Sequence, residues 1–85
     1  RLWPLPVYPD YKEQLRSEVA DLSNVGGRAA GACTAASFLR AFVGDTAWAH
    51  IDIAGTAWSE EKSGSQAKGA TGVMVRTLTQ LARMI

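Results

Sequence analysis

Apolar and polar positions at the start of the chain predict an extended arm followed by a short helix. Residues 1–9 place three prolines among apolar side chains. Proline fixes φ and biases the residue before it toward extended conformations, so this stretch favours an extended, packed arm. Asp10 lies three residues before Glu13, the spacing of a capping box, and this predicts that a helix begins there. Tyr11, Leu15 and Val19 recur every four residues among polar ones, which predicts a short surface helix with one narrow apolar stripe.

Two further helices follow from spacing and composition. The second is expected over about residues 29–43. The first half of this helix carries only small side chains on every face, so the helix needs close neighbours on several sides. Bulky side chains begin only at Phe38, and Gly44 ends the helix. The last helix is expected to begin after Thr71, a capping residue. Its apolar side chains recur at helical spacing between Met74 and Ile85.

A strand is expected between these helices, at residues 48–53. It is apolar enough to be buried and it ends in a glycine-containing turn. The polar stretch 59–68 that follows favours a surface loop, and no second strand is expected with which the first could pair. A buried strand without a partner leaves its backbone groups unsatisfied, which is costly. The order helix, helix, strand, helix therefore predicts an α/β fragment of a larger sheet protein, with most of its strands missing.

Composition and charge limit the function classes. With 85 residues the chain forms one small domain at most. Its net charge of +1 gives neither a basic footprint for nucleic acid nor an acidic tail. A single cysteine, Cys33, excludes an internal disulfide, so a reducing cytosol is the default compartment. No apolar run approaches the roughly 18 residues of a membrane span.

Some residues invite a chemical interpretation that their surroundings do not support. His50 and Asp52 share one face of the expected strand and could both reach a metal ion. Two ligands without a third do not make a site, so a hydrogen-bonded core pair is the simpler hypothesis. Cys33 has no base nearby in sequence, which favours a buried, inert thiol over a nucleophile.

The stretch Gly26–Gly31 leads into the second helix as an anion-binding loop would, since helix N-termini present free N–H groups. Neither GxxxxGK[ST] nor GxGxxG is matched, so tight turning and close packing are the favoured interpretation. A small module that binds anions or nucleotides through this loop remains a weaker hypothesis.

Residues 54–57 differ from these candidates. Ligands of α/β proteins bind where strands end, because backbone groups become accessible there. The small side chains Ala54, Gly55 and Ala57 leave room for a bound molecule at such a place.

Three motifs, Asn24–Arg28, Trp48–Gly55 and Lys68–Gly72, resemble the C-terminal end of the cytosolic leucyl aminopeptidase family. These enzymes are two-metal exopeptidases that remove N-terminal residues from peptides. The resemblance implies that residues 1–85 are the C-terminal part of a single, mixed-sheet α/β catalytic domain whose upstream part is absent. It also implies a cytoplasmic enzyme that assembles as a homo-hexamer.

The resemblance further implies how the functional residues are divided. The family's metal-binding Lys, Asp and Glu residues lie upstream, so this segment is expected to contain no catalytic residue and no metal ligand. Two divalent ions, manganese or zinc, would bind elsewhere in the complete enzyme. Residues matching Ala54 and Ala57 line the pocket for the substrate's N-terminal side chain, which makes Ala54, Gly55 and Ala57 the expected substrate-binding residues. Some relatives carry a bulkier residue at Ala57, so this pocket is expected to be roomier.

A rival hypothesis is that the 85 residues exist alone as a non-enzymatic piece that acts only in folding or subunit assembly. It rests on the same missing metal ligands and the same unpaired strand. This rival predicts a poorly folded, aggregation-prone monomer.

Overall fold

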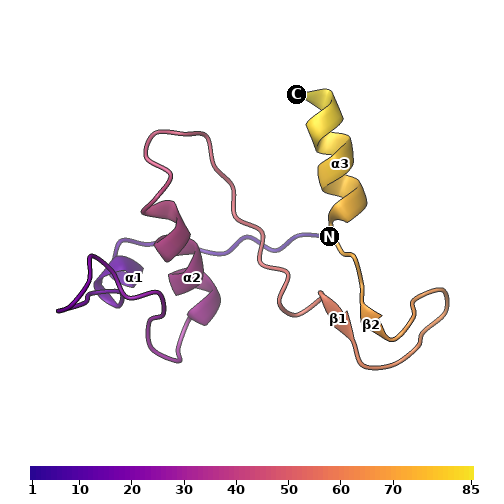
Figure 1. Cartoon of the computed structure of the whole chain (residues 1–85), viewed down its shortest axis with the longest axis horizontal. Helices are drawn as coiled ribbons and strands as arrows, with labels where there is room; N and C mark the ends of the chain where they lie inside the picture. Colours follow the sequence, from indigo (N-terminus) through magenta and orange to yellow (C-terminus); the bar gives the residue numbers. More distant parts are fainter. The chain divides into compact units, whose positions relative to one another are not determined.

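The computed structural model describes residues 1–85 and contains three helices and two short strands (Figure 1). In chain order these are α1 (Asp10–Glu13), α2 (Gly31–Arg40), β1 (Trp58–Ser59), β2 (Gly69–Ala70) and α3 (Val75–Met84). The chain divides into two compact units, Arg1–His50 with α1 and α2, and Ile51–Ile85 with the two strands and α3. None of the helices has the length and apolar character needed to cross a lipid bilayer.

The first unit is held together where α1 and the turn after it meet α2. Leu15 is completely buried there, and Cys33 and Ala36 of α2 are the other buried apolar residues. Partial burial raises the pKa of the Tyr11 hydroxyl, and the adjacent Cys33 thiol adds to the rise. The buried side of α2 consists of small side chains, as expected, and this lets neighbouring backbone approach closely.

The first helix is shorter than its apolar spacing predicts. It ends at Glu13, and the expected stripe does not continue, because Val19 is 97% exposed. After the helix the Ser23 N–H donates to the Leu15 carbonyl at 2.8 Å, so the chain folds back instead of extending the helix. Asp10 lies inside the helix and Pro9 stands at the cap without a side-chain hydrogen bond. The capping role expected of Asp10 is therefore wrong.

The strand expected at residues 48–53 is not formed. A strand exists only through pairing, and residues 48–52 make no backbone–backbone hydrogen bonds. Ile51 and Ile53 remain 38% exposed, so the burial expected of this stretch is not reached either. The position of the strand was wrong because the chain contains no partner that could form a ladder with these residues.

The sheet forms instead around the polar stretch expected to be a loop. β1 and β2 pair antiparallel, with Trp58 opposite Ala70 and Ser59 opposite Gly69. Within the connection, Ser63 and Gln66 form an isolated antiparallel bridge. The polar residues thus build the far end of a hairpin, which Figure 1 shows as the loop joining the two arrows.

The last helix forms as its apolar spacing predicts, but its start differs. Gly72 (φ 66°) and Met74 (φ 67°) adopt left-handed conformations that turn the chain into α3, and no side chain caps the helix. Thr71, expected as the cap, instead donates its hydroxyl hydrogen bond to the Thr56 carbonyl. No residue of α3 is buried, so its apolar face is uncovered in this chain.

Candidate functional site

Residues 52–57 form a tight turn held by its own hydrogen bonds. One carboxylate oxygen of Asp52 accepts the N–H of Ala54 at 2.8 Å. The Ile53 carbonyl accepts the N–H groups of Thr56 and Ala57 at 2.9 and 2.8 Å, and the Thr56 hydroxyl also donates to it, at 3.2 Å. Asp commonly closes such turns by bonding a backbone amide two residues on. The turn is therefore well defined even though the preceding residues are not in a sheet.

A second set of hydrogen bonds fastens this turn to the residue that follows β2. The Thr71 N–H donates to the Ala57 carbonyl at 2.9 Å, which extends the pairing of β1 and β2 by one position. The Thr71 hydroxyl donates to the Thr56 carbonyl at 2.6 Å and accepts the N–H of Val73 at 3.3 Å. The hairpin thus carries the turn at its open end.

The three expected substrate-binding residues all lie in this turn. Ala54 and Gly55 are exposed and Ala57 is half-buried. A Cβ built on Gly55 would meet no atom within 4 Å, and the backbone there is not left-handed. Within these 85 residues, space therefore surrounds the turn at Gly55.

The residues considered for a metal do not form a site. Asp52 is exposed and its carboxylate serves the turn, so the core position expected for it is wrong. The His50 ring lies 6.1 Å from the Trp48 ring in a stacked arrangement. The chain contains no group of three or more His, Cys, Asp or Glu side chains that could hold a metal ion together.

In the glycine-rich stretch before α2, Gly26 packs closely against Thr34 of that helix. A Cβ at that residue would lie 3.0 Å from the Cγ2 atom of Thr34, so only glycine fits without displacement. Cys33 is buried, as expected of an inert thiol. Ala30, in a left-handed conformation, precedes α2 without a side-chain hydrogen bond.

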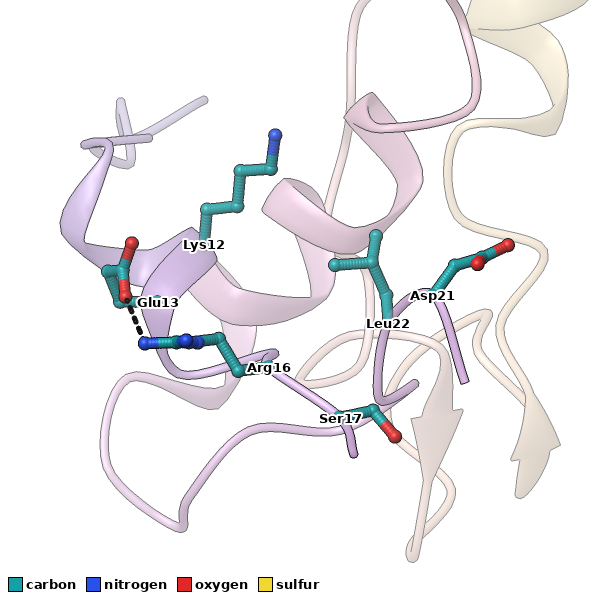
Figure 2. A pocket seen from close by; sticks show the side chains of 6 residues that line it. All are labelled: Lys12, Glu13, Arg16, Ser17, Asp21 and Leu22. Carbon is teal, nitrogen blue, oxygen red and sulfur yellow. Dashed lines mark ion pairs between the residues drawn. The ribbon is translucent and has the colours of Figure 1, made fainter. Parts of the chain in front are cut away.

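One hollow of about 510 Å³ was not anticipated from the sequence (Figure 2). It is lined by residues of α1 and the following turns, namely Lys12, Glu13, Arg16, Ser17, Asp21 and Leu22. Arg16 and Glu13 form an ion pair at 3.6 Å, and both side chains are exposed, so water screens their attraction. The mixed charges leave no net preference for a ligand of either sign.

Comparison with known proteins gives the context of the turn. Residues 1–79 match the model of the cytosol aminopeptidase family, catalytic domain. Probable cytosol aminopeptidases of Roseiflexus castenholzii and Solibacter usitatus are 58% and 57% identical over 84 and 82 residues. These alignments cover 98% and 96% of the chain. A third, from Geobacter sulfurreducens, is 58% identical over 80 residues, or 94% of the chain.

The chain spans only 17%, 17% and 16% of the length of these three relatives. Its helices and antiparallel pair of strands agree with an α/β fragment of the family's catalytic domain, which confirms the expected fold class. Since the match runs through all three motifs singled out in the sequence, the chain belongs to the cytosol aminopeptidase family.

Proposed function

We propose that these 85 residues are the C-terminal part of a single catalytic domain in a longer aminopeptidase that removes N-terminal residues from peptides. The observation that carries this proposal is the match of residues 1–79 to the family's catalytic domain. Relatives named probable cytosol aminopeptidase are about six times as long as the segment that aligns with them. The complete enzyme would act on peptides with a free N-terminus, in the cytoplasm and as a homo-hexamer.

Within that enzyme, the segment supplies one edge of the pocket for the substrate's N-terminal side chain. Ala54, Gly55 and Ala57 lie on one hydrogen-bonded turn, and the space beside Gly55 is open. Side chains this small leave the volume of the pocket to the substrate, so large apolar N-terminal residues fit best. The small side chain of Ala57 widens the pocket beyond that of relatives with a bulkier residue there.

Two divalent ions, manganese or zinc, belong to the complete enzyme rather than to this segment. As the family resemblance implies, their ligands would come from the remainder of the catalytic domain. This segment contributes binding and packing.

The proposal is tested with the full-length protein loaded with manganese or zinc. We expect it to release leucine from leucine amide, and the 85-residue chain alone to release none, measured by leucine formation over time. A full-length protein that releases no leucine with either metal would overturn the proposal. It would leave the rival hypothesis, a non-enzymatic piece acting in folding or subunit assembly.

Substitution of Gly55 tests the pocket edge. Gly55→Ala adds one methyl group without backbone strain and without a clash inside these 85 residues, so we expect the full-length enzyme to remain folded, which its free energy of unfolding checks. We expect KM for leucine amide to rise about tenfold, because one methyl group in a pocket is worth on the order of 1–3 kcal/mol. The matched control is Gly27→Ala, also in open space but outside the turn. Equal KM values for the two variants would remove Gly55 from the pocket.

A further inference from the structure

The motif Lys68–Gly72 contains the hydrogen bond between a side chain and the backbone that joins the most distant residues of the chain. The Thr71 hydroxyl donates to the Thr56 carbonyl, a residue 15 positions earlier. Every other hydrogen bond between a side chain and the backbone joins residues at most four positions apart. Thr71 is therefore the residue whose side chain ties together distant parts of the second unit.

The direction of this bond is fixed by its acceptor, because a carbonyl oxygen has no proton to donate. A hydroxyl has one proton to donate and two lone pairs to accept with. The hydroxyl proton of Thr71 therefore goes to the Thr56 carbonyl at 2.6 Å, and one of its lone pairs accepts the Val73 N–H at 3.3 Å. Gly72, with φ 66°, lets the chain turn so that Val73 reaches this position.

The backbone of Thr71 also bonds the turn. The Thr71 N–H donates to the Ala57 carbonyl, so two consecutive carbonyls of the turn are held by Thr71. The first half of the turn is fixed separately, by Asp52 and by the Ile53 carbonyl. Without the hydroxyl, the peptide group between Thr56 and Ala57 loses one of its two anchors and can rotate. That rotation displaces Ala57 and, through the chain, Gly55.

We propose that Thr71 is a positioning residue that sets the edge of the substrate pocket by clamping the turn containing Ala54, Gly55 and Ala57. This inference rests on the proposed function for its effect on substrate and on the hydrogen bonds for its structural part. Thr71 acts through the turn and not by contact with the substrate. Its hydroxyl therefore governs how well a large N-terminal side chain is bound, and not the rate of bond cleavage.

The test compares Thr71→Val with Thr71→Ser in the full-length enzyme. Valine keeps the shape of threonine without the hydroxyl, and serine keeps the hydroxyl. For Thr71→Val we expect KM for leucine amide to rise about fivefold, the effect of losing one hydrogen bond. We expect kcat to stay within about twofold of its original value, since the interaction is the same in ground and transition states. KM for alanine amide, whose side chain is shorter, should hardly change, and Thr71→Ser should restore both constants.

Thr79→Val is the matched control, because the Thr79 hydroxyl donates only to Val75 of its own helix, at 2.8 Å. The inference is overturned if Thr71→Val behaves like Thr79→Val with both substrates. It is also overturned if kcat falls equally for leucine amide and alanine amide, as expected from a general loss of folded enzyme. An unsubstituted enzyme that cleaves neither amide speaks against the proposed function alone.

Hydrogen exchange measures the clamp without any activity. In Thr71→Val the amides of Thr56 and Ala57 should exchange faster than in the original protein, since the turn that protects them loosens. In Thr79→Val their exchange should be unchanged. Unchanged exchange at these two amides in Thr71→Val would overturn the inference whatever the kinetic result.

Discussion

The 85-residue chain on its own should unfold without a cooperative transition. Its buried apolar residues are only Leu15, Cys33 and Ala36. Burying even a leucine-sized side chain gives only about 1.5–3 kcal/mol, and fixing the backbone of each residue costs about 1–2 kcal/mol. Three such side chains cannot offset the ordering of a chain of this length. Trp3, Phe42 and Ile85 meanwhile remain 88%, 68% and 95% exposed and invite self-association.

The measurement is a calorimetric or circular-dichroism melt of the purified 85-residue chain at several concentrations, with the full-length protein as the control. We expect a broad, concentration-dependent change for the chain and a sharp transition for the full-length protein. A sharp, concentration-independent melt of the monomeric chain would contradict this expectation. It would also argue against residues 1–85 being part of a single larger domain.

The helices show what the sequence could predict. Apolar spacing predicted the last helix, observed as α3. The second helix, expected over residues 29–43 and ended by Gly44, is observed as the shorter α2, Gly31–Arg40. Helical spacing is a local property, so it can be read without knowing the rest of the protein. The partner of the apolar face of α3 is not local, and no residue of this chain covers that face.

The strand at residues 48–53 shows where prediction failed. Its apolar residues indicate a preference for burial, but a strand also needs a second strand to pair with. That second strand can come from residues far away in the sequence. The hairpin of β1 and β2 was missed for the opposite reason. Its connecting residues are polar, and pairing there depends on local turns, such as the one at Gly64 with φ 56°, rather than on apolar alternation.

The candidate site was predicted only in part. Ala54, Gly55 and Ala57 came from small side chains at an expected strand end together with a family resemblance, and the structure gathers them in one turn. Thr71 was expected to cap a helix, because its hydroxyl suits that role equally well. Its actual acceptor, the Thr56 carbonyl, lies 15 residues away, and no local pattern reveals such a bond.

Gly26→Ala should destabilise the full-length protein by about 1–3 kcal/mol, the usual cost of forcing an extra methyl group into a packed site. The added Cβ would stand 3.0 Å from Cγ2 of Thr34. Thr34 cannot turn away without loss, because it is buried in α2 and its hydroxyl donates to the Gly31 carbonyl at 3.1 Å. The measurement is the free energy of unfolding in urea. The control, Gly27→Ala, places its Cβ in open space and should change that energy by less than about 0.5 kcal/mol.

A second substitution assigns the cost to this one contact. Thr34→Ser removes Cγ2 and keeps the hydroxyl that bonds Gly31. In the double variant, Gly26→Ala should cost less than it does beside threonine, although Cβ and Oγ1 of residue 34, at 3.3 and 3.4 Å, leave part of the crowding. An equal cost in both backgrounds would mean that the two residues do not interact. The cost at position 26 would then come from something other than the close approach to α2, and not from backbone strain, because Gly26 is not in a left-handed conformation.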